Sequence, residues 1–356
     1  MKITFVSPPP NLSGGVRVVA IYADALRARG HEVNVVATSA PQLSSKARLK
    51  GLARDLVGRR RPSGATHYDT MQAPLTLLDH PGPVTDADVP DADVVIATWW
   101  ETAFAVAGLS ASKGAKFYFV QHHEVHAHLP RHLSAGSYYL PLKKITISDW
   151  LKDTMAQTYG DADVDLVPNS VDLSVFHAPP RGRQPVPTLG LMYAVQPFKG
   201  LDTSFAVIEA ARRTHPDLRV VCFGAIPPHK DLPLPDNTTY IQSPSPDALR
   251  ETYAMCDVFL TSSRIEGFGL PILEAMACRT PVVATRTGCA AGVISNGVNG
   301  YVAPVEDVTA LAAGITNILN LEDAPWRAMS DAARDMAASY TWEDAAVRFE
   351  QAITLR

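Results

Sequence analysis

The sequence predicts an α/β fold made of two Rossmann-like domains, each built on a parallel β-sheet. Short apolar segments alternate with amphipathic helical segments through both halves of the chain. The apolar segments are mostly unbroken, as expected of strands that helices cover on both faces. A length of 356 residues suits two hydrophobic cores better than one.

The first half follows this alternation from the first residues onward. We expect strands at Lys2–Val6, Glu32–Ala37, Val94–Thr98, Phe117–Gln121, Lys144–Ile147 and Asp165–Val167. The segment Val16–Arg29 is amphipathic and is predicted to be a helix that Gly30 ends. Pro8-Pro9-Pro10 stops the first strand, so this segment does not resemble a signal peptide.

The second half repeats the pattern after a proline-rich segment. Residues 179–187 contain four prolines and are predicted to link a domain at 1–178 to one at 188–340. The elements expected there are Thr188–Tyr193, helix Leu201–Arg213, Arg219–Phe223, Thr239–Ile241, helix Asp247–Met255 and Val258–Leu260. Ala92–Thr98 and Cys256–Ser262 share one pattern, so the two halves are predicted to contain the same kind of strand. Thr341 is expected to cap a last helix, within 341–356.

Composition excludes several classes of protein. The formal net charge of −4 argues against a nucleic-acid binder, and no apolar run is long enough to span a bilayer. The four cysteines are widely spaced and form no CxxC pair. We therefore expect free thiols and a cytoplasmic protein.

One stretch has a strong local charge. Lys46–Arg61 holds seven basic residues and one acid, with leucines at helical spacing. A basic amphipathic helix binds anionic membrane surfaces, so the stretch predicts peripheral membrane contact. The alternative is a solvated helix that packs its leucines on the domain.

Glu266 and Glu274 carry the clearest chemical signal. They lie eight residues apart in a segment that is expected to leave a strand, pass through a loop and enter a helix at Pro271. Glu266 is expected on the loop and Glu274 in the first turn of the helix. Such loops lie at the carboxyl edge of a parallel sheet, where ligands bind. Gly267 and Gly269 let a ligand approach the backbone, and a helix N-terminus favours phosphate. Two carboxylates beside a phosphate site suit a nucleotide sugar.

The chain resembles the family 4 retaining glycosyltransferases over nearly its full length. The resemblance rests on Ser13-Gly14-Gly15, Ile147-Ser148, Val167-Pro-Asn-Ser-Val-Asp-Leu173, Phe198-Lys-Gly200 and the Glu-x7-Glu unit with Gly267-Phe268-Gly269-Leu270. It implies the GT-B architecture, with a C-terminal helix that returns to the N-terminal domain. It also implies a nucleotide diphosphate sugar donor, an acceptor that is a glycan or lipid-linked glycan, and no metal cofactor.

The resemblance assigns roles in the second domain. Glu274 is expected to bind the ribose hydroxyls, Glu266 the donor sugar and Lys199 the leaving diphosphate. Ile241 lies in a segment expected to read the base. An arginine that the family places before the lysine is replaced here by Tyr193 or Ala194. Arg264 and Arg17 are candidates for its role.

Further candidates lie in the first domain. Gly14 and Gly15 open a predicted helix, so their amides suit a donor phosphate or an acceptor oxygen. The resemblance places a histidine near the donor sugar, and His122 is preferred over His123, which is also a candidate to contact the acceptor. Trp99 and Trp100 follow a strand, which predicts either an acceptor wall or core packing. The Asp-x-Asp pairs, including Asp91 and Asp93, are predicted to be solvated loops instead of metal ligands.

Together these observations predict a retaining glycosyltransferase. Lys199, Glu266 and His122 are the expected catalytic residues. No residue is placed as a covalent nucleophile, so front-face displacement is expected, with Lys199 stabilising the leaving diphosphate. The alternatives are a sugar-nucleotide epimerase of the same architecture and a sugar-binding protein without catalysis.

Overall fold

The computed structural model describes residues 1–40, 66–126 and 129–354. The chain divides into two compact units. The first comprises Met1–Ile147, Leu151–Val167 and Ala346–Arg356, and the second comprises Ser148–Trp150 and Pro168–Ala345. The basic stretch Lys46–Arg61 lies outside the described residues, so its membrane contact stays a prediction.

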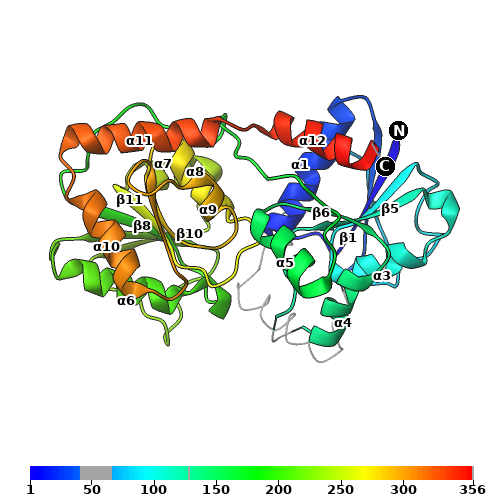
Figure 1. Cartoon of the computed structure of the whole chain (residues 1–356), viewed down its shortest axis with the longest axis horizontal. Helices are drawn as coiled ribbons and strands as arrows, with labels where there is room; N and C mark the ends of the chain where they lie inside the picture. The colour runs from blue at the N-terminus through cyan, green and yellow to red at the C-terminus, as the bar shows by residue number, and fades with distance from the viewer. Residues whose placement is uncertain (41–65, 127–128, 355–356) are drawn as a thin grey trace, which may run out of the picture. The chain divides into compact units, whose positions relative to one another are not determined.

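The first unit contains a parallel sheet in the order β3-β2-β1-β4-β5-β6-β7. Strands β1, β5 and β6 of this sheet are labelled in Figure 1. Its strands are β1 Lys2–Ser7, β2 Glu32–Ala37, β3 Leu75–Leu77, β4 Val94–Ala97, β5 Ala115–Val120, β6 Lys143–Thr146 and β7 Val164–Leu166. Its helical elements are α1 Gly14–Ala28, α3 Trp100–Gly108, η1 Ala111–Lys113, α4 Arg131–Gly136, η2 Ser137–Tyr139 and α5 Asp149–Tyr159. The predicted strands are present with ends shifted by a residue or two, and β3 was not predicted.

The second unit contains a parallel sheet in the order β10-β9-β8-β11-β12-β13. The strands are β8 Thr188–Met192, β9 Arg219–Gly224, β10 Thr238–Gln242, β11 Val258–Thr261, β12 Val282–Thr285 and β13 Gly300–Ala303. The helical elements are η3 Pro197–Lys199, α6 Leu201–Arg212, α7 Pro246–Ala254, α8 Leu270–Ala277, α9 Ala290–Val293, α10 Val308–Leu319 and α11 Asp323–Ala338. Two parallel α/β sheets confirm the predicted fold class.

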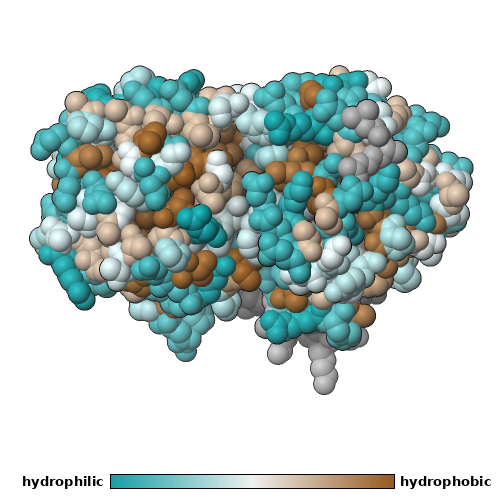
Figure 2. Space-filling model, in the orientation of Figure 1, coloured by the Kyte–Doolittle hydropathy of each residue, from teal (hydrophilic) through white to brown (hydrophobic). Residues whose placement is uncertain are grey.

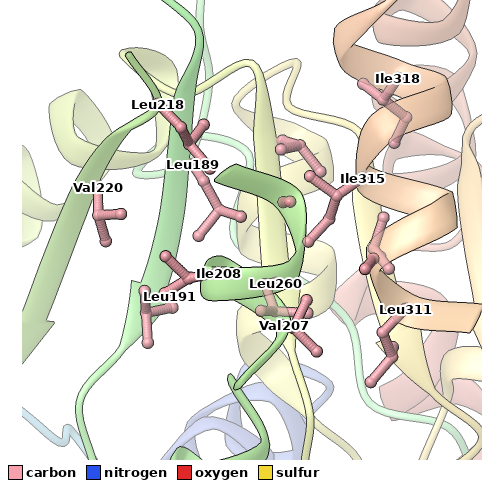
Figure 3. Packing of buried hydrophobic residues seen from close by; sticks show 14 of the residues in the cluster. Leu189, Leu191, Val207, Ile208, Leu218, Val220, Leu260, Leu311, Ile315 and Ile318 are labelled. Carbon is pink, nitrogen blue, oxygen red and sulfur yellow. The ribbon is translucent and has the colours of Figure 1, made fainter. Parts of the chain in front are cut away.

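The core of the second unit fills the space between its sheet and the helix pair α6 and α10 (Figure 3). Leu189, Leu191 and Leu260 come from the strands, whereas Ile208 and Ile315 come from the helices, and all are buried. Apolar side chains from both layers interdigitate there, and this burial is the main favourable contribution to folding. The core holds the carboxyl ends of β8 and β11 in fixed positions.

The end of the chain packs in the first unit. Helix α12, Trp342–Thr354, places Phe349 against Tyr22 of α1, with ring centroids 4.5 Å apart. Glu350 accepts a hydrogen bond from Arg29 Nε at 2.7 Å. Asp344 N donates to Thr341 Oγ1 at 3.1 Å and Thr341 N donates to Asp344 Oδ2 at 2.9 Å, so the predicted cap is present.

The same hydrogen-bond arrangement occurs at the amino edges of the two sheets. Asp93, just before β4, accepts a hydrogen bond from Lys2 N at 2.7 Å. Asp257, just before β11, accepts from Thr188 N at 2.9 Å. Each aspartate therefore satisfies the first amide of the neighbouring strand, β1 or β8, which explains the pattern shared by Ala92–Thr98 and Cys256–Ser262.

The predicted linker, 179–187, lies within the second unit. Arg181 stacks over the Trp326 ring at 4.6 Å and its guanidinium donates to Thr280 Oγ1 at 3.0 Å. Arg183 donates to Leu319 O at 2.7 Å. The proline-rich segment is thus fixed to this unit by its two arginines.

All four cysteines are free and buried. Burial raises the pKa of the Cys222 and Cys278 thiols to about 12.

Hydrophilic residues cover much of the face seen in Figure 2. Within the described part of the chain, none of the helices has the length and apolar character needed to cross a membrane.

Candidate functional site

Two loops of the second unit are joined at the carboxyl ends of β8 and β11. Arg264 N donates to Phe198 O at 2.8 Å, and Ser262 Oγ donates to Gly200 O at 2.6 Å. Gly200 has φ 64°, and a Cβ there would lie 2.1 Å from Ser262 O. Only glycine allows this approach, so Gly200 fixes the loop that carries Lys199 against the loop that carries Glu266.

Lys199 and Glu266 form an ion pair in these joined loops. Lys199 Nζ lies 2.7 Å from Glu266 Oε1, and Ser263 Oγ donates to the same oxygen at 2.7 Å. The Glu266 side chain is 11% exposed and that of Lys199 is 23% exposed. An ammonium that remains partly accessible beside a carboxylate suits a ligand that bears both an anion and hydroxyl groups. The structure therefore brings two predicted residues together.

The start of α8 follows directly. Gly269 has φ 88° and precedes Leu270, the first helical residue, so Pro271 stands at the second helical position. Phe268 O accepts a hydrogen bond from Cys289 N at 2.7 Å, and Phe268 is buried. Gly267 connects this turn to Glu266. The predicted turn therefore places Glu266 beside a helix N-terminus, where the helix dipole favours anions.

Glu274 lies deeper than the sequence suggested. The sequence predicts it in the first turn of the helix, but α8 begins at Leu270, and its first turn contains no acidic residue. Glu274 is buried, and Tyr253 OH donates to its Oε2 at 2.9 Å. Tyr253 on α7 was not predicted as a site residue. It orients the carboxylate, and only the folded contact between α7 and α8 reveals it.

Arg264 is bound to neighbouring carboxylates. Its guanidinium donates to Asp202 Oδ1 at 2.9 Å and Oδ2 at 2.7 Å, and to Glu306 Oε1 at 2.5 Å. Hydrogen bonds to Asp202 and then Glu306 raise the pKa of Arg264 above its ordinary value. In the structure, this predicted donor residue is therefore held by Asp202 and Glu306.

Tyr193, at the position of the missing arginine, is buried, and its hydroxyl group binds the backbone of a loop. Its hydroxyl donates to Leu232 O and accepts from His229 N, both at 2.8 Å. Ile241 lies on β10, half-buried and paired with Phe223 of β9. Ser243 N donates to Gly224 O at 2.8 Å, which closes the end of this strand pair.

In the first unit, Gly14 and Gly15 begin α1, and Ser13 is its N-cap. Neither glycine has a positive φ, and a Cβ on Gly14 would meet nothing within 4 Å. A Cβ on Gly15 would lie 3.7 Å from the Gln121 amide nitrogen. Gln121 is buried, and its Oε1 has no hydrogen-bond partner among the described residues. The sequence analysis missed this amide, whose position depends on β5 ending beside α1.

The two candidate histidines follow β5. His122 lies half-buried, with its ring 4.9 Å from that of His126. His123 Nε2 lies 2.7 Å from Tyr159 OH, and its ring stacks on Tyr138. Burial, followed by the nearby His126, lowers the pKa of His123. Both rings are therefore held by aromatic neighbours in the first unit.

The two tryptophans have different surroundings. Trp99 is half-buried and caps α3, whereas Trp100 is buried against Phe104, with ring centroids 6.5 Å apart. Trp100 therefore packs in the core, and Trp99 keeps an accessible face.

Arg17 lies in the first turn of α1. Burial lowers the pKa of the nearby His67, and the charge of Arg17 lowers it further.

The aspartate pairs anchor loops. Asp91 pairs with Lys113 at 2.9 Å, and Asp161 with Lys144 at 2.6 Å. Asp86 accepts from Ser110 N at 2.8 Å. In the described ranges, no group of three or more His, Cys, Asp or Glu residues is arranged to hold a metal ion.

Two protein families match successive parts of the chain. Residues 12–175 match the model described as Glycosyltransferase Family 4, and residues 186–336 match Glycosyl transferases group 1. Solved structures agree on the fold. HepE from Anabaena, solved with UDP and glucose, has a TM-score of 0.72 and 16% identity, and the match covers 99% of this chain and 98% of that one. Sucrose-phosphate synthase from Thermosynechococcus elongatus has a TM-score of 0.69 and 15% identity, with the same coverage.

The fold and the matched families define a GT-B protein. More narrowly, the chain belongs to the family 4 glycosyltransferases.

Curated relatives add a partial match. The D-inositol 3-phosphate glycosyltransferase of Mycobacterium marinum is 31% identical over 207 residues, which is 51% of this chain and 43% of the relative. That of Stackebrandtia nassauensis is 31% identical over 175 residues, or 44% of this chain and 39% of the relative. The matched segment thus spans less than half of each relative's length.

Proposed function

We propose that the protein is a retaining glycosyltransferase that moves a sugar from a nucleotide diphosphate sugar to a hydroxyl group of a glycan or lipid-linked glycan. The observation that carries this proposal is the Lys199–Glu266 ion pair beside the N-terminus of α8. Similarity to HepE, solved with UDP-glucose, supports the donor class, and similarity to D-inositol 3-phosphate glycosyltransferases supports glycosyl transfer.

In the proposed reaction, the bond between the sugar C1 and the phosphate oxygen breaks while C1 bonds to the acceptor oxygen on the same face. The acceptor proton passes to the departing phosphate. Lys199 Nζ exchanges Glu266 for the diphosphate, which leaves the Glu266 carboxylate to accept hydrogen bonds from sugar hydroxyls. Glu274, oriented by Tyr253, accepts from the ribose hydroxyls. His122 is proposed to contact the donor sugar.

The test has two stages. UDP-, GDP- and ADP-sugars are first screened for thermal stabilisation, since a ligand at 100 times its Kd adds about 2.7 kcal/mol. The stabilising donor is then incubated with glycan acceptors, and NMR of the product reports the anomeric configuration. Retention of the donor configuration supports the proposal. Release of an epimerised sugar without an acceptor would favour an epimerase, and binding without turnover a sugar-binding protein.

A further inference from the structure

A buried carboxyl group connects two segments of the first unit that carry candidate residues. Glu124 follows β5 by a short loop and is only 3% exposed. Its Oε2 accepts a hydrogen bond from Trp100 N, in the first turn of α3, at 2.8 Å. Tyr118 OH lies 3.4 Å from the same oxygen. The side chain thus reaches from the loop after β5 to the helix after β4.

The backbone of Glu124 is fixed as well. Glu124 N donates to Tyr138 OH at 2.8 Å, and Tyr138 OH donates to His122 O at 3.1 Å. The Tyr138 ring stacks between Tyr118 and His123, with centroid distances of 5.7 Å to each. Together these residues form the Glu124 cluster: Trp100, Tyr118, His122, His123, Glu124 and Tyr138. The cluster joins the start of α3, the loop after β5 and η2.

Among the described residues, none of the groups that shift the pKa of the Glu124 carboxyl is a cation. Burial raises the pKa of Glu124 well above its ordinary value, and Glu101 on α3 raises it further. The groups that lower it are Trp100 N and the Tyr118 hydroxyl. Burial raises the pKa of Tyr118 and Tyr138 too, so the facing phenols stay neutral. The carboxyl therefore serves as a hydrogen-bond acceptor at a fixed place, which an apolar residue does not replace.

We propose that Glu124 is a positioning residue, which holds the acceptor candidates Trp99, at the start of α3, and His123, after β5, in the arrangement that receives the acceptor. It holds His122, the candidate contact of the donor sugar, in the same cluster. This inference rests on the proposed transferase function. Glu124 itself acts through Trp100 N and Tyr138, because its carboxyl is enclosed by the cluster.

The kinetic test compares Glu124→Gln with Glu124→Leu. Glutamine keeps an oxygen for Trp100 N, whereas leucine keeps the volume and removes the acceptor atom. Glu124→Leu should lower kcat/KM for the acceptor about 10–100-fold, the range for groups misplaced by about 1 Å. Glu124→Gln should stay within about threefold of wild type. Nucleotide affinity, measured by calorimetry, should stay unchanged in both variants, since Lys199 and Glu274 lie in the second unit and Gly14 and Gly15 lie outside the Glu124 cluster.

Asp257→Asn supplies a matched control. Asp257 is also buried and also accepts backbone hydrogen bonds, from Gln184 and Thr188, but at the amino edge of the second sheet. The Asp257→Asn variant should have a lower midpoint of thermal unfolding, without a selective change in acceptor KM or kcat. Equal acceptor kinetics for wild type and Glu124→Leu would overturn the proposal, as would an equal loss of acceptor turnover and nucleotide affinity.

A pH series adds a readout that simple loss of packing does not reproduce. Because the folded pKa of Glu124 is raised, its contribution to stability is complete below the unfolded pKa and is lost as pH rises through the folded pKa. Glutamine does not ionise. Denaturant unfolding should therefore shift in favour of Glu124→Gln as pH rises, and a pH-independent difference would contradict a neutral carboxyl in the cluster.

Failure of the function and failure of the inference are separable. If wild type transfers no sugar to any acceptor, the proposed function fails. NMR of the His123 ring then still tests the cluster: Glu124→Leu should return the lowered pKa of His123 toward its ordinary value, and Glu124→Gln should not. An unchanged His123 titration in Glu124→Leu would overturn the positioning role by itself.

Discussion

At the amino edge of the first sheet, Asp93 binds Lys2 N, and at the same edge of the second sheet, Asp257 binds Thr188 N. Within the described ranges, the carboxyl edges of the two sheets differ from each other. The first unit has the Glu124 cluster there, whose facing groups are phenols and backbone amides. The second has the ion pair of Lys199 and Glu266.

This difference separates what holds the fold from what meets a ligand. The amino edge repeats because any parallel sheet must satisfy the first amides of its central strand. An ion pair whose lysine is partly accessible can exchange partners with an incoming ligand, whereas a buried neutral cluster cannot do so without large cost. The second unit is thus suited to bind a charged donor, and the first to present a fixed surface.

The largest expected effect tests the exchangeable pair. Lys199→Ala should lower kcat about 10²–10³-fold, as does the loss of one preorganised donor to developing charge. Donor affinity should fall less, because most of that charge develops in the transition state. Steady-state kinetics with the identified donor measure both. If the Lys199→Ala variant kept nearly full turnover, Lys199 would not belong to the site. The proposed contrast between the two units would then be wrong.

The two glutamates should differ in what they bind. Glu274→Ala should weaken nucleoside diphosphate binding about 10–100-fold, since a hydrogen bond to a charged group contributes about 1.5–3 kcal/mol. Glu266→Ala should leave that affinity nearly intact while it lowers turnover. Calorimetry with the nucleotide alone decides between them. Equal losses in the two variants would abolish the division of roles.

A backbone substitution tests how rigidly the second unit holds its loops. Gly200→Ala places a Cβ against Ser262 O at a left-handed φ of 64°. We expect a loss of about 1–3 kcal/mol in the free energy of unfolding. Gly14→Ala is the control, because its Cβ meets open space and its φ is not positive. Similar losses in both variants would show that the joined loops are not the constraint.

The smallest effect concerns Arg264. Because its carboxylate partners are largely exposed, Arg264→Ala should cost at most about 1 kcal/mol of stability and leave turnover within about threefold of wild type. Arg264 lowers the pKa of Asp202, so its stabilisation is present at neutral pH and is lost as pH falls through the folded pKa of Asp202. Denaturant unfolding at several pH values checks this. A turnover loss as large as that of Lys199→Ala would make Arg264 the substitute for the missing arginine, and Arg17→Ala tests the other candidate in the same way.

The sequence predicted the fold well because apolar periodicity determines parallel strands directly. Lys2–Val6 and Glu32–Ala37 match β1 and β2 closely. Strand β3 was missed because Leu75–Leu77 is short and exposed, so no buried pattern marks it. No element was predicted between Glu274 and Thr341, although β12, β13, α10 and α11 lie there.

The candidate site was predicted only where residues close in sequence form it. The turn from Glu266 to Glu274 is local, so spacing revealed it. Lys199 was assigned from a family resemblance, and its ion pair with Glu266 was not predicted. Tyr253, Gln121 and Glu124 were missed, because their roles arise from contacts between elements far apart in the chain. A single buried carboxyl leaves no mark in a sequence.

The burial of Cys222, Cys256, Cys278 and Cys289 has a practical consequence for labelling chemistry. Maleimides react with thiolates, and with pKa values of about 12 for Cys222 and Cys278 almost no thiolate is present at neutral pH. Burial raises the pKa of Cys256 and Cys289 as well. A cysteine introduced on the surface should therefore take a fluorophore or spin label selectively in the folded protein. The native thiols need not be removed first, so each unit can carry its own reporter.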